Sequence, residues 1–298
     1  EWHSAIKNLK NGLFGVKFDG ESAELWHRKS QGHVTELDNG PATKRQRIPS
    51  LIQDGKVKML GEKEFHFSHL LPANWKDSIQ QWLNEDIPSF DIGGFVVGDK
   101  DEHAILWAKT SGMLAGIPFF EAVFQELGCR VEWLHRDGAK LDVSGGKVAI
   151  ANVYGPCRQI LLGERTALNI ISRASGVATL AHEAVALAEA NNWHGCVAGT
   201  RKTTPGFRLV EKYGLVVAGA ATHREDLSQM VMLKDNHIWS AGSITNAVKL
   251  AKRAAGFSIK IEVECQSIEE AREAAEAGAD IVMLDNFGPE KCKTDAAA

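Results

Sequence analysis

The residues best suited to chemistry are two pairs of adjacent cations in one stretch of the chain, residues 198–224. Arg201-Lys202 follows a short apolar run and leads into two threonines and a Pro-Gly turn, and His223-Arg224 closes the stretch. Arginine offers a planar fork to carboxylates and phosphates, lysine offers a point charge, and donors converge where a strand gives way to a loop. A lone Arg-Lys pair is more often part of a solvated basic loop, but the second pair favours an anion-binding site.

Charged residues also follow several strand-like segments farther along the chain. Residues 194–199, 230–233, 258–263 and 281–284 are apolar runs that end, in that order, at Arg201-Lys202, Lys234, Glu264 and Asp285. Between them lie helical patterns at 244–255 and 268–277, each followed by a glycine, and the second begins with a capping box. Alternating strands and helices predict parallel strands whose carboxyl ends meet at one mouth, as in β/α barrels.

One strand of this series carries alternating charges. Lys260, Glu262 and Glu264 alternate with Ile259, Ile261 and Val263, so the three charges are expected on one side. A single strand exposed on one face would give the same pattern. Four strands with polar ends favour a shared site instead.

The charges predict the class of ligand. So many cations would repel one another in a buried site unless a ligand with several negative charges neutralised them. Glu264 and Asp285 lie at the ends of successive strands. Such a pair can hold Mg²⁺ or stabilise positive charge that develops on a ribose ring.

The same residues carry a resemblance to a known family. GTRKTTPGFRLVEKYG at 199–214, ATHR at 221–224 and VMLKDNH at 231–237 resemble the quinolinate phosphoribosyltransferases (carboxylating nicotinate-nucleotide pyrophosphorylases), with a match from about Leu71 onward. The resemblance implies that the pyridine nitrogen of quinolinate displaces pyrophosphate from phosphoribosyl pyrophosphate. CO₂ is then lost, and nicotinate mononucleotide forms in NAD biosynthesis.

The resemblance also implies roles for individual residues. Glu264 and Asp285 would face the ribose and Mg²⁺, and Lys202 would also take part in catalysis. Arg165, in GERTALN, would reach the substrate of the neighbouring subunit, so a homodimer or hexamer is implied. The residues expected to bind the dicarboxylate are Arg165, Arg201, Lys202, His223, Arg224 and Lys234.

The expected fold is mixed α/β, with an N-terminal α/β sandwich-like subdomain and an incomplete β/α barrel. Residues 1–68 are an unassigned extension with short strands expected at 13–18, 23–26 and 57–60; residues 71–172 are the N-terminal domain and 173–298 the catalytic barrel. Strands are further expected at 104–108, 112–116, 131–134, 147–152 and 159–162, and helices at 75–84, 118–127, 164–172 and 178–190. The family continues after the strand that ends at Asp285, so part of the barrel with its phosphate site is expected to be missing, which would impair catalysis.

Composition bounds the remaining alternatives. The 298 residues carry a formal net charge of −4, which argues against a nucleic-acid binder, and no long apolar run suggests a membrane span. Five scattered cysteines without metal-ligand spacing fit reduced thiols in the cytoplasm. Three other functions stay open: nicotinate phosphoribosyl transfer, a non-catalytic scaffold of the same fold, and a stable barrel whose charges decorate the surface.

Overall fold

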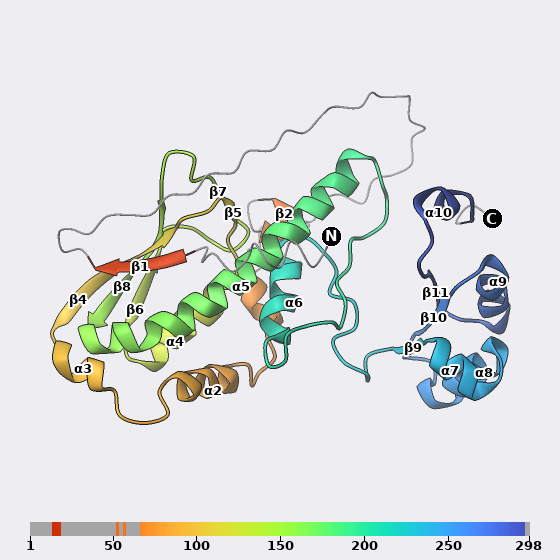
Figure 1. The fold of residues 1–298 in the computed structure, drawn as a ribbon, viewed down its shortest axis with the longest axis horizontal. Helices are drawn as coiled ribbons and strands as arrows, with labels where there is room; N and C mark the ends of the chain where they lie inside the picture. Colours follow the sequence, from red (N-terminus) through yellow and green to blue (C-terminus); the bar gives the residue numbers. More distant parts are fainter. Residues whose placement is uncertain (1–13, 19–51, 54–55, 58–65, 296–298) are drawn as a thin grey trace. The chain divides into compact units, whose positions relative to one another are not determined.

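The computed structural model describes residues 14–18, 52–53, 56–57 and 66–295 (Figure 1). The described chain divides into two compact units, one of residues up to Gly199 with Thr203–Thr222, the other of Thr200–Lys202 with the residues from His223 onward. The strand expected at 23–26 lies outside the described residues. Within the part that the structure describes, no helix is long and apolar enough to cross a membrane.

The first unit is built on a four-stranded antiparallel sheet of order β1-β4-β8-β6. Its strands are β1 (Phe14–Phe18), β4 (Asp101–Ala108), β8 (Val148–Pro156) and β6 (Arg130–Trp133). In β4 the buried residues alternate with partly exposed ones, as expected for a strand with one face in a core. Two shorter antiparallel strand pairs join β2 (Ile52–Gln53) to β3 (Lys56–Val57) and β5 (Gly112–Met113) to β7 (Lys140–Leu141).

Helices cover this sheet and form the larger core. They are η1 (Phe67–Leu70), α2 (Lys76–Asp86), α3 (Ile92–Val97), α4 (Ile117–Glu126), α5 (Cys157–Ala190) and α6 (Arg208–Val217). Helices α4 and α5 pack against each other and against the strands, with α6 against α5 (Figure 1). Phe119, Phe120 and Phe124 of α4 are completely buried at the centre, where Phe119 makes edge-to-face contacts with Trp75 and Tyr213.

Two sequence-based predictions for this unit are wrong. Residues 159–162 form a helix rather than a strand, and the two helices expected at 164–172 and 178–190 are one continuous helix of 34 residues, α5. A short apolar run does not distinguish a buried strand from a buried helix, and the apolar face of α5 continues through it. Gly163 does not interrupt α5; it lets α4 approach, because a Cβ there would lie 2.9 Å from Leu127 Cδ1.

The strand expected at 112–116 also ends early, at Met113. Gly116 adopts φ +102° and precedes the first turn of α4, and Pro118 falls at the start of that helix. Pro is well tolerated there because the first helical N–H groups have no partner in the helix. The chain therefore turns directly from the short strand into the helix.

The second unit is a repeated β/α structure with a three-stranded parallel sheet of order β11-β10-β9. Its strands are β9 (Val231–Leu233), β10 (Ile261–Cys265) and β11 (Ile281–Leu284); its helices are α7 (Asp235–Ala241), α8 (Ile244–Ala255), α9 (Ile268–Ala277) and α10 (Pro289–Asp295). Ser243 and Ser267 cap α8 and α9 through their hydroxyls. The two units together confirm the expected mixed α/β class.

The predicted segment at 194–199 belongs to the first unit. In the described chain it makes a single parallel bridge, Ala198 with Ala221, and that bridge belongs to the first unit. The segment has few side chains to pack, because its apolar run is short and is flanked by glycines at 195 and 199. The local sequence pattern therefore predicted a longer strand than the single bridge that forms. Three of the four expected strands thus lie in one parallel sheet.

Candidate active site

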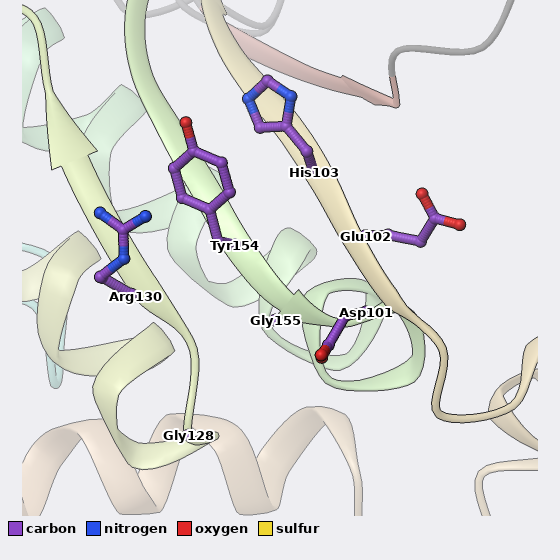
Figure 2. Close-up of a pocket in the computed structure, with 7 residues that line it drawn as sticks. All are labelled: Asp101, Glu102, His103, Gly128, Arg130, Tyr154 and Gly155. Carbon is purple, nitrogen blue, oxygen red and sulfur yellow. The ribbon is translucent and has the colours of Figure 1, made fainter.

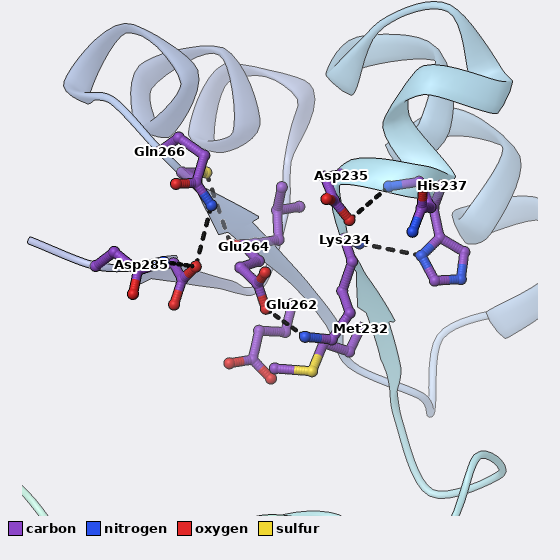
Figure 3. A network of polar contacts seen from close by, with 12 residues as sticks. Met232, Lys234, Asp235, His237, Glu262, Glu264, Gln266 and Asp285 are labelled. Atoms are coloured by element: carbon purple, nitrogen blue, oxygen red, sulfur yellow. Dashed lines mark hydrogen bonds and ion pairs between the residues drawn. The ribbon is translucent and has the colours of Figure 1, made fainter. Parts of the chain in front are cut away.

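The two faces of the parallel sheet differ in chemistry. One face presents Ile261, Val263 and Cys265, which are buried with Leu233 against α8 and α9. The alternate positions place Glu262 beside Met232, and Glu264 beside Met283, on the other face. A parallel sheet that carries two adjacent carboxylates on one face must offer that face to polar partners, and the structure shows several of them (Figure 3).

Lys234 and Glu264 form an ion pair at the carboxyl edge of this sheet. Lys234 Nζ lies 2.5 Å from Glu264 Oε2, and the Glu264 side chain is only 13% exposed. Lys234 comes directly after β9 and precedes the first turn of α7, and its backbone N–H donates to His237 Nδ1 at 3.1 Å. The pair is therefore held between a strand end and a helix start, with the charges pointing toward each other in Figure 3.

His223 and Glu262 form a second contact deeper on the same face. Glu262 is 3% exposed, and its Oε2 lies 3.0 Å from His223 Nε2. A carboxylate this buried needs a hydrogen-bonding or charged partner, and the imidazole supplies it. His223 itself adopts a φ of +57°, which is uncommon for a residue other than glycine.

Arg224 is held beside this pair and is 9% exposed. Its guanidinium donates to the Met230 carbonyl at 3.2 Å and approaches the Met232 sulfur at 3.5 Å. Arginine carries a positive charge in proteins, so Arg224 places a cation at the start of the mostly exposed segment that leads into β9.

Asp285 follows β11 at the same edge of the sheet. Its Oδ2 accepts hydrogen bonds from the side-chain amides of Gln266 at 3.0 Å and Asn286 at 2.6 Å. Gln266 follows β10 directly, so neighbouring strand ends supply both the carboxylate and its partner (Figure 3).

The other predicted site residues occupy loops and a helix. Arg201 and Lys202 are exposed and group with the second unit, and the Lys202 N–H donates to Thr200 Oγ1 at 3.0 Å. The parallel bridge between Ala198 and Ala221 starts both cation-bearing segments in register, so Arg201 and Arg224 each lie three residues beyond it. Arg165 is exposed on α5 in the first unit.

The structure thus gathers most of the predicted residues in the second unit. His223, Arg224, Lys234, Glu264 and Asp285 lie on or beside one small parallel sheet, and Arg201-Lys202 belongs to the same unit. Cations alternate with carboxylates, so the site can bind oxyanions through the former and stabilise developing positive charge through the latter.

Two residues of this cluster were not predicted as site residues. Glu262 was noticed only as one of three alternating charges, and Gln266 carried no signal at all. Alternation on β10 would have identified Glu262, since it occupies the same face as Glu264 two residues later. Gln266 becomes visible only when the parallel register places it next to Asp285.

A surface depression lies elsewhere, in the first unit. It measures about 550 Å³ and is formed over β4, β6 and β8 (Figure 2). Arg130 lies over the ring of Tyr154 at 4.4 Å, and Tyr154 stacks on His103 with ring centroids 4.7 Å apart. None of the predicted site residues lines it, so its size does not make it the candidate active site.

Family profiles match most of the described chain. The profile described as the quinolinate phosphoribosyl transferase N-terminal domain matches residues 89–175, and the C-terminal domain profile matches residues 177–298. The C-terminal match extends to residue 298 and does not support the expectation that part of this domain is missing.

Curated relatives and solved structures agree with these profiles. The carboxylating nicotinate-nucleotide pyrophosphorylase of Rattus norvegicus is 54% identical over 76% of this chain and 75% of its own length. The one from Dictyostelium discoideum is 51% identical over 76% and 80%. The crystal structure of NadC from Streptococcus pyogenes superposes with a TM-score of 0.70 at 35% identity, covering 76% of this chain and 80% of that one.

Proposed function

The chain belongs to the quinolinate phosphoribosyl transferase family, and from that premise we propose that it transfers a phosphoribosyl group to quinolinate with loss of CO₂. The donor is phosphoribosyl pyrophosphate, and the products are nicotinate mononucleotide, pyrophosphate and CO₂. The observation that carries the proposal is the cluster of cations and carboxylates on one face of the parallel sheet, with Lys234 paired to Glu264 at its edge.

The cations suit a dicarboxylate. Two adjacent ring carboxylates need donors from more than one direction, and Arg201, Arg224 and Lys234 come from three separate segments. Lys202 and His223 stand next to two of them in the chain and supply further donors. Charge-assisted hydrogen bonds of this kind are shorter and stronger than neutral ones.

The carboxylates suit the transfer step. The lone pair of the pyridine nitrogen forms a bond to the anomeric carbon while the bond from that carbon to the pyrophosphate oxygen breaks, and pyrophosphate leaves with the electron pair. Positive charge develops on the ribose, and Glu264 and Asp285 at the strand ends complement it. The ring nitrogen is then positively charged and withdraws electrons from the carbon that loses CO₂. That carbon takes up a proton in place of the carboxylate.

The donor set fits Mg²⁺ only as a partner of the substrate. Among the described residues no group of three or more His, Cys, Asp or Glu side chains could hold a metal ion by itself. Mg²⁺ is commonly bound by one or two carboxylates together with phosphate oxygens, and it neutralises charge on the leaving pyrophosphate. Asp285 is the better ligand of the expected two, since Glu264 is engaged by Lys234.

The assembly and cellular place follow from the same proposal. Arg165 is exposed on α5, where it can enter the site of a second subunit, so the active form is a homodimer or a larger homo-oligomer. The reaction serves NAD biosynthesis in the cytoplasm, where the five free cysteines stay reduced.

One assay separates the proposed reaction from its alternatives. Purified protein is given phosphoribosyl pyrophosphate and Mg²⁺ with either quinolinate or nicotinate, and mononucleotide and CO₂ are both measured. Product and equimolar CO₂ from quinolinate, with little product from nicotinate, are expected. Turnover of nicotinate alone would establish the sister activity, while turnover of neither substrate and no saturable heat on titration with quinolinate would indicate a scaffold.

A further inference from the structure

We propose that Glu211 and Lys212, consecutive residues of α6, are positioning residues that hold the two cation-bearing loops of the anion site. Neither residue was assigned a role in the site. The inference rests on the proposed function, because its consequence is the binding of an anionic substrate. It is carried by the contacts of the two side chains, which go to different loops.

Glu211 holds the loop that follows Arg201-Lys202. Its Oε2 accepts the backbone N–H of Thr204 at 3.1 Å, and its Oε1 lies 3.0 Å from Arg173 of α5. Arg173 also donates to Thr204 Oγ1 at 3.1 Å. Thr204 is therefore hydrogen-bonded through its backbone to the carboxylate and through its side chain to the guanidinium. Thr204 lies two residues after Lys202, and its fixed backbone limits where the lysine can move.

Lys212 holds the loop that carries His223-Arg224. Its side chain is 1% exposed, and its Nζ donates to the carbonyl of Thr222. Thr222 directly precedes His223, whose left-handed backbone conformation is strained and must be supported by its surroundings. A buried ammonium directed at that carbonyl supports the turn and therefore the direction of the two cations after it.

The two contacts act on segments that are already in register. The bridge between Ala198 and Ala221 is formed by hydrogen bonds from Gly199 to Ala221 and from Ala221 to Val197, at 2.9 and 2.8 Å. The bridge aligns the two segments at their start. Residues of α6 then hold the first segment at Thr204, just after Arg201-Lys202, and the second at Thr222, just before His223-Arg224. Adjacent like charges repel one another, so loops that bear them require such fixing before the ligand arrives.

The test compares Lys212→Met and Glu211→Ala with Val210→Ala. Val210 is a completely buried neighbour on α6 with an apolar side chain, so its truncation loosens helix packing without removing a side-chain hydrogen bond to either loop. Four properties of each full-length variant are measured. They are the melting temperature, the dissociation constant for quinolinate, KM and kcat as separate constants, and the rates of backbone amide exchange. Glu211→Ala is the safer variant if Lys212→Met fails to fold, because Glu211 lies nearer the surface.

Each positioning variant is expected to weaken quinolinate binding at least tenfold while kcat changes less than threefold. Without any substrate, Lys212→Met should speed amide exchange at His223 and Arg224, and Glu211→Ala at Thr204, by tenfold or more. Val210→Ala should lower the melting temperature yet leave binding within twofold of the parent. The matched control thus separates positioning from a general loss of stability.

Two results would overturn the inference: parent-like binding and exchange in both variants, or an equal loss of binding in Val210→Ala at matched melting temperature. Failure of the proposed function has a different signature, because the parent itself would then not bind quinolinate. In that event the positioning role is tested by amide exchange in the substrate-free variants. Exchange rates at Thr204, His223 and Arg224 that match those of the parent would refute it.

Discussion

At the scale of single residues, the site depends on charges that are held before any ligand binds. Arg224 is nearly buried, and its guanidinium donates to the Met230 carbonyl and approaches the Met232 sulfur. Arg201 is exposed and lies in register with it across the parallel bridge. The two arginines therefore differ in burial but share a function in the proposed site.

Arg224→Ala and Arg201→Ala are each expected to weaken quinolinate binding by about 2 kcal/mol, or about thirtyfold, since a carboxylate loses its charge-assisted partner. Fluorescence titration measures the change. Arg253→Ala removes an exposed charge near the end of α8 and serves as the control. Parent-like affinity in both site variants would remove the assignment.

Glu264→Gln is expected to lower kcat by about a hundredfold or more while the dissociation constant for quinolinate changes less than threefold, because its negative charge matters most in the transition state. Single-turnover kinetics separate the two effects. Equal damage to binding and turnover would instead indicate that Glu264 only holds Lys234 in place.

Asp137 introduces a pH dependence of stability outside the site. Burial raises the pKa of its carboxyl to about 6, although it accepts hydrogen bonds from Tyr213 Oη at 2.6 Å and from the Ile117 N–H at 3.2 Å. Because the folded pKa exceeds the unfolded one, this contribution is fully present below about pH 4 and is lost as the pH rises through 6. From pH 4 to 7 the parent should lose on the order of 2–3 kcal/mol of unfolding free energy relative to Asp137→Asn. Denaturant titrations that show the same pH slope for both proteins would contradict this.

At the scale of elements, the position of α6 on α5 governs the loops that carry the cations. Gly214 lets the two helices approach, because a Cβ there would lie 2.6 Å from the Ala174 carbonyl oxygen, a backbone atom that cannot rotate away. Glu211 and Lys212, for which we propose a positioning role, lie on this same helix, α6.

Gly214→Ala is expected to destabilise the protein by about 1–3 kcal/mol through overpacking, even though alanine is the better helix former by about 1 kcal/mol. Gly93→Ala in α3 is the matched control, since a Cβ at Gly93 meets nothing closer than 3.7 Å. The control should be neutral or slightly stabilising in thermal unfolding. A stabilised Gly214→Ala variant would show that α5 and α6 can separate without cost.

At the scale of the whole molecule, the proposed assembly makes each site depend on two chains. Arg165 is exposed on α5 and belongs to a different unit from Arg201. If Arg165 enters the neighbouring subunit's site, Arg165→Ala and Arg201→Ala should each have little activity alone at quinolinate concentrations that just saturate the parent. A mixed dimer then contains one intact site and one doubly damaged site.

Subunit-exchange complementation tests that assembly. The two weakened variants are mixed, allowed to exchange subunits and assayed at that quinolinate concentration. About a quarter of the parent activity is expected when half the dimers are mixed and each has one intact site. A mixture of Arg165→Ala with Arg224→Ala provides a second combination. Absence of recovery after exchange has been demonstrated would place Arg165 outside the partner's site.

The sequence by itself determined the family, the mixed α/β class and the residues of the cation cluster. Local patterns suffice for these, since caps, strand alternation and the motif GTRKTTPGFRLVEKYG are properties of neighbouring residues. The helix stops at Gly256 and Gly278 were read correctly for the same reason: a left-handed or open backbone there favours glycine whatever surrounds it.

Only the tertiary structure decided how those residues are joined. That 159–162 is helical depends on burial of α5 against α4, and that 194–199 is merely bridged depends on its partner, Ala221. The pairs of Lys234 with Glu264 and of His223 with Glu262 span 30 and 39 residues, and the roles of Glu211 and Lys212 arise from contacts with loops on either side of α6. Long-range register and packing set these contacts, and local periodicity carries no information about them.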